Sequence, residues 1–504
     1  MGFWDWFKPK PPIQPPTQPQ PEPVKYCRVS VFAADGSGLA PVTGGTLRFD
    51  DPSWPILEAV LEGGRLKFTL PKPAVYGWQV HLTATTEAQD GRWDVILAPD
   101  IDVALPSSEP AHAPRRGIVR LSGQSWQDDG GPYYPLGDTL LYALGHWHRG
   151  GAKRELVKEN LAFLASYSHD YIRILGQVDW AGEEIDPNWP TYDQDLGDLI
   201  DCAYDTYGLR TKVTVIGGGA PNPKACAEPV RRVIAAGRQQ KAQLLEAVNE
   251  QNGSGADAVT IARVLGGLGV PVATGRGNAG ISTIKDEGDL AHTSVDCFHT
   301  ERGLGSTDEP GGAHARQVRQ CWDFHHFNRA SENGEPPGPA SSVATLTDPY
   351  QLATFRAASI ICGAGAFCLH TGSGVYGRDY LSSAGMRYAR LADIPNIDAI
   401  MTAVRNADLR LPSGIENWPA FNVGHPVNHI QGEANKLFGC RHDRSFVEVL
   451  IGCDGIQTFQ ATVAVDVAVY HIATGGMVGE HHLSAGQTFQ QAGLWAYLLV
   501  GETR

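Results

Sequence analysis

The sequence lacks the features that would place a chain in a membrane or on nucleic acid. None of its uncharged apolar runs is long enough to cross a bilayer, and its first residues lack the apolar segment and small-residue cleavage site of a signal peptide. Acidic residues outnumber basic ones by 55 to 41, which gives a formal net charge of −14 at pH 7. A surface of that sign repels phosphate backbones, so we expect no nucleic-acid partner and no transmembrane segment. We expect synthesis in the cytoplasm, and the final location stays open.

Motifs for metal and nucleophile chemistry are also missing. The nine Cys residues include no CxxC pair or close cluster, which favours free, mostly buried thiols over disulfides or a zinc site. No HExxH motif accompanies the close pairs of His residues, and no GxSxG motif marks a serine hydrolase. We therefore expect neither a metal ion nor a cofactor.

The first 24 residues have a composition of their own. Pro and Gln dominate residues 9–23, which predicts a stiff, extended linker. Four aromatic residues precede it: Phe3, Trp4, Trp6 and Phe7. Two interpretations stay open, a sticky terminus or a short peptide that docks to a larger assembly or a membrane surface.

The rest of the chain divides into three parts. Residues 25–117 consist of short runs of alternating character between Gly, Pro and Asp turns, which is typical of a small β-sandwich domain. Residues 118–408 alternate apolar runs with helical patterns. Residues 409–504 return to the β rhythm and suggest a second, C-terminal β-sandwich domain.

The alternation within residues 118–408 predicts a parallel sheet. Candidate strands occupy residues 135–144, 171–178, 210–217, 243–249, 270–274, 294–299, 325–331 and 366–370. Candidate helices occupy residues 152–167, 191–207, 223–240, 256–268, 281–290, 312–323, 348–363 and 394–407. Eight strand–helix repeats fit a (β/α)8 TIM barrel, so the predicted fold is multidomain, with a central barrel flanked by two β-sandwich domains.

The fourth candidate strand ends on an Asn–Glu pair. The stretch "LLEAVNE" carries Asn249 and Glu250 at the point where the apolar pattern breaks. Residues just past the carboxyl end of a barrel strand face the shared mouth, so both side chains are expected there. A solvated loop Glu would explain the residue equally well, so the pair alone decides nothing.

A second carboxylate follows the seventh candidate strand. The stretch "NRASENGEPPGP" contains Glu332 and Glu335. Glycoside cleavage uses two carboxyl groups across one mouth, one as acid and then base, the other as nucleophile. The sequence therefore favours this chemistry.

At these motifs the chain resembles the clan-A retaining glycoside hydrolases, which are (β/α)8 barrels with Asn–Glu after strand four and a nucleophilic Glu after strand seven. "DDGGPYYPLGDTLLYAL" at residues 128–144 and "YIRIL" at residues 171–175 are also similar to that family. The chain departs from it at Gln251, where a Pro or small apolar residue is usual. It departs again at His370, where many members carry Trp.

The resemblance implies a role for each site residue. Glu250 would be the acid/base and Glu335 the nucleophile, with Glu332 as the alternative nucleophile. Asn249 would bind the sugar 2-OH, and Arg173 would keep the nucleophile ionised. His299, at the end of the sixth strand, would donate a hydrogen bond near the nucleophile, although it could also be a satisfied core residue. His370 would be a further substrate-binding residue.

Aromatic residues after the first two candidate strands suit a sugar groove. Trp147 follows the first, and Trp180 and Trp189 follow the second. Indole rings stack on the C–H faces of sugars, but a Trp in these loops can also simply cover the barrel. "GRGNAG" at residues 275–280 matches GxGxxG, yet a dinucleotide site needs that motif to open a doubly wound sheet, so we expect a loop at the mouth.

Two classes of function remain. The first is a retaining glycoside hydrolase that cleaves β-glycosidic bonds of a poly- or oligosaccharide, with a phage or bacterial enzyme against cell-surface glycan as one hypothesis. The second is a non-catalytic carbohydrate-binding or virion-assembly protein on a barrel scaffold, which the Pro-rich tail and the β modules would suit. Two carboxylates in one mouth favour the enzyme, because a binding protein does not need them.

Overall fold

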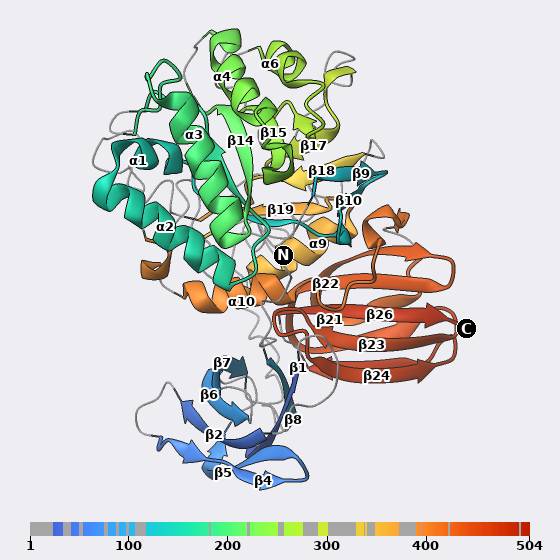
Figure 1. Cartoon of the computed structure of the whole chain (residues 1–504). Helices are drawn as coiled ribbons and strands as arrows, with labels where there is room; N and C mark the ends of the chain where they lie inside the picture. The colour runs from blue at the N-terminus through green and yellow to red at the C-terminus, as the bar shows by residue number, and fades with distance from the viewer. Residues whose placement is uncertain are drawn as a thin grey trace, which may run out of the picture. The chain divides into compact units, whose positions relative to one another are not determined.

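A computed structural model describes most of the chain (Figure 1). The described residues are 24–33, 42–49, 54–74, 79–86, 90–96, 100–105, 117–180, 183–218, 222–249, 257–275, 291–300, 329–336, 338–339, 348–371, 390–394, 396–421, 424–492 and 495–504. Two compact units divide the chain, residues 1–32 with 38–103, and residues 33–37 with 104–504. No helix in the described ranges is both long and apolar enough to span a bilayer.

The first unit contains two four-stranded sheets, in the orders β4-β5-β1-β8 and β3-β2-β6-β7. Their strands are β1 (Val24–Ala33), β2 (Val42–Phe49), β3 (Leu57–Glu58), β4 (Val60–Glu62), β5 (Arg65–Ala74), β6 (Gln79–Thr86), β7 (Asp90–Ile96) and β8 (Asp100–Leu105). Strands β1 and β5 pair antiparallel, as do β2 and β6. Alternation along the strands buries Leu47, Phe68 and Leu82 completely, which is the period-2 pattern expected of half-buried strands.

The second unit contains the predicted barrel. Eight parallel strands follow the order β16-β15-β14-β13-β12-β19-β18-β17. They are β12 (Leu136–Thr139), β13 (Tyr171–Leu175), β14 (Arg210–Ile216), β15 (Ala242–Val248), β16 (Val272–Ala273), β17 (Val295–Phe298), β18 (Ala330–Asn333) and β19 (Ala366–Leu369). Hydrogen bonds between Val272 and Ser294 join the two ends, from Ser294 N to Val272 O at 2.8 Å and from Val272 N to Ser294 Oγ at 3.0 Å.

Helices cover the outside of these strands (Figure 1). They are α1 (Ala143–Arg149), α2 (Gly151–Ser166), α3 (Tyr192–Asp201) with the π-helical turn η2 (Cys202–Thr206), α4 (Pro223–Ala235), α6 (Ala258–Leu265), α9 (Pro349–Ile361) and α10 (Ile397–Asn406). Local sequence sets their starts: Asn222 and Asp348 cap α4 and α9 by accepting backbone N–H bonds, and a Pro follows each cap. The helices expected at residues 281–290 and 312–323 lie outside the described residues.

A small antiparallel sheet closes the amino-terminal end of the barrel. It consists of β9 (Arg120–Ser122), β10 (Ser125–Asp128) and β11 (Gly131–Tyr133). Trp126 and Tyr133 pack on apolar side chains at the strand starts, among them Leu244 and Ala330. Arg210, the first residue of β14, pairs with Asp128 at 2.9 Å. The interior of the barrel therefore has an apolar floor.

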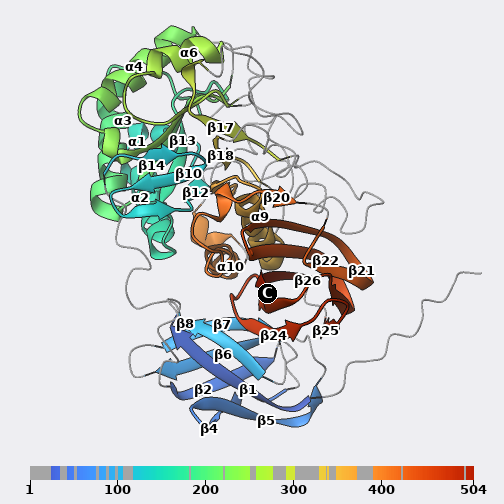
Figure 2. The ribbon, with the colours of Figure 1, turned by 90° about the vertical axis from the view of Figure 1, so that its right-hand side faces the viewer.

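The C-terminal part forms a sheet in the order β20-β21-β22-β26-β23-β24, with β25 paired to β22. Its strands are β20 (Ala420–Phe421), β21 (Val427–His442), β22 (Ser445–Ala461), β23 (Val465–His471), β24 (Met477–Leu483), β25 (Thr488–Ala492) and β26 (Trp495–Thr503). Along β22, Val447 and Val449 join the core of the barrel, whereas Phe446 and Leu450 join a separate cluster. One face of this sheet thus packs on the barrel, beside α9 and α10 (Figure 2).

Candidate functional site

The side chains that point into the barrel form three layers above one another. The lowest is the apolar floor over Trp126. The middle layer is charged and contains Lys212, Glu246 and Glu332, all at most 1% exposed. The top layer, at the carboxyl ends of the strands, is where Glu335 lies. Interior charges are costly unless they are paired, so their contacts define the site.

Glu335 lies two residues beyond the end of β18 and is 2% exposed. Its Oε1 accepts a hydrogen bond from Nη1 of Arg173. Its Oε2 lies 3.6 Å from Nδ1 of His299 and 3.7 Å from Nε2 of His370. Gly334 allows this approach, because a Cβ there would lie 2.8 Å from Sγ of Cys297 and 3.2 Å from Nε2 of His299. The structure therefore brings together Glu335, Arg173, His299 and His370.

Arg173 is fully buried on β13 and uses every nitrogen of its guanidinium. Nε donates to Oγ1 of Thr214 at 3.0 Å and to Oε2 of Glu246 at 3.1 Å. Nη2 lies 2.9 Å from the same Glu246 oxygen and donates to Oδ1 of Asn249 at 2.8 Å. Only Nη1 remains for Glu335. The planar guanidinium of Arg173 thus contacts the carboxylates of Glu246 and Glu335 and the amide of Asn249 at the same time, which its fixed geometry favours.

Asn249 follows β15 directly and its backbone N–H bonds to Ile216 O at 2.7 Å. Its side chain is partly exposed at the carboxyl end of β15 and contacts Arg173. Glu250, the next residue, lies outside the described residues. The separation of the Glu250 and Glu335 carboxyl groups therefore stays a prediction.

Glu332 lies inside β18 and not after it, because the seventh strand begins at Ala330, later than the predicted 325–331. Its Oε1 accepts from the Tyr171 hydroxyl at 2.5 Å and its Oε2 from Nζ of Lys212. It is 1% exposed. Both oxygens are thus held by buried donors below the mouth, and Glu335 is the carboxylate of this segment that lies in the top layer.

Trp147 and Trp180, two of the three Trp residues expected near a sugar groove, lie in different environments. Trp147, on α1, is 4% exposed, belongs to the barrel core and lies under the guanidinium of Arg154, 4.8 Å from its ring centroid. Trp180 is partly buried beside Tyr142, with ring centroids 6.0 Å apart at 80°. A Cβ on Gly218 would lie 2.6 Å from its Nε1, so this Gly leaves room for the indole.

Tyr142 links Trp180 to the mouth. Burial raises the pKa of the Tyr142 hydroxyl, and the negative charges of Glu183 and Glu335 raise it further, so Tyr142 stays neutral near Glu335. Trp189 instead stacks on His148 with ring centroids 3.9 Å apart. Among the three indoles, Trp180 is the one that adjoins the site, and Trp147 is a packing residue.

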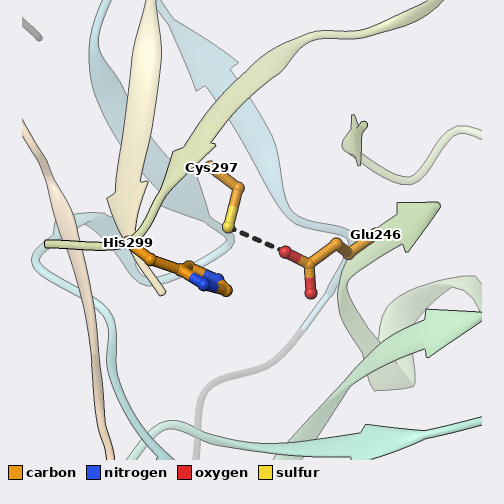
Figure 3. Close-up of side chains that lie close together, drawn as sticks. All are labelled: Glu246, Cys297 and His299. Carbon is orange, nitrogen blue, oxygen red and sulfur yellow. Dashed lines mark hydrogen bonds between the residues drawn. The ribbon is translucent and has the colours of Figure 1, made fainter. Parts of the chain in front are cut away.

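Among the residues that the structure describes, one group of three side chains has ligand atoms close enough for a metal ion. These are Glu246, Cys297 and His299, whose ligand atoms all lie within 4.8 Å of one another (Figure 3). The Cys297 thiol donates to Oε1 of Glu246 at 3.0 Å. Burial raises the pKa of Cys297 well above its ordinary value, which keeps it a thiol and a poor metal ligand. Arg173 and Lys212 already neutralise Glu246, so the group fits an ion-pair network better than a metal site.

Sequence patterns missed the charged middle layer. Lys212 lies between Thr and Val residues of "RTKVTVIG", and Glu246 is the one charge between Leu244 and Val248. These charges beside apolar residues were the available signal. Their partners are far away in the sequence, so the pairing itself could not be read from it. The "GRGNAG" stretch follows β16 of a barrel and not the first strand of an open sheet, and only Gly275 of it is described.

Comparison with known proteins supports the fold. No family model matches the chain, and no curated protein matches it in sequence. A solved structure described as a glycoside hydrolase is similar with a TM-score of 0.55 at 12% identity, over 77% of this chain and 97% of that one. A glycoside hydrolase family 5 protein from Bacteroides vulgatus ATCC 8482 gives a TM-score of 0.55 at 12% identity, over 77% of this chain and 94% of its own.

The chain has a (β/α)8 barrel, and its fold is similar to those of the two solved glycoside hydrolase structures. The barrel expected from the alternation of strands and helices is confirmed, and several antiparallel sheets accompany it.

Proposed function

We propose that this protein is a retaining glycoside hydrolase that cleaves β-glycosidic bonds of a poly- or oligosaccharide. Glu335 is the proposed nucleophile and Glu250 the proposed acid/base. The observation that carries the proposal is the environment of Glu335, a carboxylate at the end of strand seven paired with Arg173 and flanked by His299 and His370. A cation so close favours the ionised form that a nucleophile needs.

The proposed reaction takes two steps. An oxygen of Glu335 attacks the anomeric carbon while the bond to the leaving oxygen breaks, and Glu250 gives that oxygen its proton. A water molecule then attacks the anomeric carbon, Glu250 takes its proton, and the ester bond to Glu335 breaks. The hydroxyl group on sugar C2 is the proposed partner of Asn249, in a contact that strengthens as charge develops.

Several other parts have proposed roles in binding. Trp180 is the proposed stacking platform, since it adjoins Tyr142 near Glu335. His370 is proposed to line the subsite next to the nucleophile. We further propose that residues 25–117 and 409–504 act as accessory β-sandwich domains around a catalytic barrel at 118–408. The aromatic tail at residues 1–24 is proposed as a docking segment.

A hydrolysis screen tests this function. The purified chain is incubated with aryl β-glycosides and bacterial exopolysaccharides, and the anomer first released from a cleaved substrate is identified by proton NMR. We expect the β-anomer, with activity lost in Glu335→Gln. Release of the α-anomer would refute retention. Polysaccharide binding without cleavage of any substrate would favour the non-catalytic alternative.

A further inference from the structure

Glu246 is a fully buried carboxylate that the proposed reaction does not use. It lies on β15, one layer below the mouth, and none of its surface is exposed. Its Oε2 lies 2.9 Å from Nη2 of Arg173 and 3.3 Å from Nζ of Lys212. Burial alone would raise the pKa of Glu246, but the charges of Arg173, Lys212 and His299 lower it to about 2. The side chain is therefore ionised in a place where water cannot screen it.

Five ionisable side chains form a ladder of alternating charge through the barrel. In order they are Glu332, Lys212, Glu246, Arg173 and Glu335, and each contacts the next. Three carboxylates share two cations, so neither cation belongs to one carboxylate alone. Interactions between buried charges are screened much less than those at a surface. A change of charge at one position therefore alters the electrostatic field at the next.

We propose that Glu246 is a positioning residue that fixes the guanidinium of Arg173 and divides its charge between itself and Glu335. Two nitrogens of the fork, Nε and Nη2, face Oε2 of Glu246 at 3.1 and 2.9 Å. That contact turns Nη1 toward Glu335 and lets Nη2 reach Asn249. With Glu246 neutral, the positive charge of Arg173 would act on Glu335 without competition.

Other titratable groups on neighbouring elements also lie near Glu246 and Glu335. Glu335 meets His299 past β17 and His370 past β19, and Tyr142 lies near it ahead of α1. Glu246 also accepts a hydrogen bond from the Cys297 thiol at 3.0 Å and experiences the charge of His299. A substitution at Glu246 leaves all of these groups in place.

The test follows the ionisation of Glu335 directly. The full chain is labelled with carbon-13 at the Glu side-chain carboxyl, and the Glu335 signal is identified by its loss in Glu335→Gln. Glu246→Gln keeps the shape and an accepting oxygen but removes the charge. We expect the titration midpoint of Glu335 to move about one pH unit lower. An unchanged midpoint, or one that moves higher, would overturn the proposal.

Glu332→Gln is the matched control. It removes the charge of a second buried carboxylate beside the same Lys212, but it does not touch Arg173. We expect the midpoint of Glu335 to move less than half as far as in Glu246→Gln. Equal shifts in the two variants would mean a general loss of interior charge and no specific role for Glu246.

A second variant and a kinetic measurement complete the test of Glu246. If Glu246→Gln does not fold, Glu246→Asp keeps the charge and withdraws it from Arg173, and a smaller shift in the same direction is expected; no shift would overturn the proposal. A kinetic measurement rests on the proposed function. In the pH profile of kcat/KM, the midpoint on the acid side should move by as much as the carbon-13 titration midpoint of Glu335. The substitution should change kcat more than KM. The titration of Glu335 does not require enzymatic activity. A parent chain that hydrolyses no substrate would refute the proposed function, and the titration would still test the role of Glu246.

Discussion

Nη2 of Arg173 donates a 2.8 Å hydrogen bond to Oδ1 of Asn249, which connects the second strand of the barrel to the end of the fourth. Because a guanidinium only donates, the accepting atom of the amide must be its oxygen. The amide nitrogen of Asn249 is then the end of the amide that does not contact Nη2 of Arg173. We propose that this nitrogen is the donor to a sugar hydroxyl.

The first prediction concerns that donor. Asn249→Ala should lower kcat/KM about a hundredfold on a substrate that the parent cleaves, since a contact that strengthens in the transition state is lost. On the matching 2-deoxy substrate, which has no hydroxyl group at C2, the same variant should lose much less. Steady-state kinetics on both substrates measures the difference. Equal losses on the two substrates would assign Asn249 to holding Arg173 instead.

The second prediction concerns Glu250. Glu250→Ala removes the proposed proton donor, so substrates with poor leaving groups should lose most of their rate while activated aryl glycosides keep more of theirs. Azide should restore turnover and give the β-glycosyl azide, identified by NMR, because it attacks the glycosyl-enzyme. An α-glycosyl azide from this variant would mean that Glu250 is the nucleophile and Glu335 the acid/base.

The third prediction concerns Glu335 and its neighbour in the chain. Glu335→Ala should abolish the covalent step for activated and poor substrates alike, and azide should then give the α-glycosyl azide by a single displacement. Glu332→Ala is the comparison. It should chiefly lower the melting temperature, because it leaves Lys212 as a buried charge short of one partner. A stable but inactive Glu332→Ala beside an active Glu335→Ala would make Glu332 the nucleophile.

The presence of eight parallel barrel strands could be predicted from the sequence, but the interior of the barrel could not. Apolar runs marked several of the other barrel strands, but the first prediction, at residues 135–144, was too long, because β12 ends at Thr139 and α1 begins at Ala143. The sequence of β18 is "ASEN", which is mostly polar. The strand predicted at residues 325–331, which reads "HHFNRAS", therefore began too early in the chain and ended before Glu332. Arg173 and Glu335 were expected to meet because the family motifs implied it, and the structure brings them together.

Contacts between charges on different strands were beyond sequence reasoning for a physical reason. Lys212 and Glu332 are 120 residues apart, and their pairing depends on strand register and on which side chains point inward. A lone charge in an apolar strand indicates that a partner must exist, since an unpaired buried charge is costly. It does not indicate which strand supplies that partner. Burial of Trp147 was likewise decided by packing around α1.

The fourth prediction lies in the C-terminal sheet. Burial raises the pKa of Glu448 on β22 to about 7, although a contact of 3.2 Å with Nδ1 of His425 opposes the shift. The folded chain therefore binds this proton more tightly than the unfolded chain, whose ordinary Glu value is 4.5. The resulting stability is fully present below pH 4.5 and is lost as the pH rises through about 7.

Glu448→Gln removes that dependence. Relative to the parent, the variant should gain about 3 kcal/mol of unfolding free energy between pH 4.5 and pH 8. Thermal melts of both proteins at the two pH values measure the gain. Glu480→Gln, at an exposed position of β24 in the same sheet, is the control and should give no comparable change. A parent and a Glu448→Gln variant whose melting temperatures move in parallel with pH would contradict the prediction.

The β9–β11 sheet limits how far the chain can be shortened from its N-terminal side without exposing the interior of the barrel. Trp126 and Tyr133 belong to the floor, and Arg210 at the start of β14 is tied to Asp128 of β10. A shortened chain that began at β12 would keep all eight barrel strands and still leave apolar side chains and a buried guanidinium uncovered. Recombination breakpoints or engineered fusions that preserve the barrel should therefore fall before residue 117, and the floor should be inherited together with the strands that it seals.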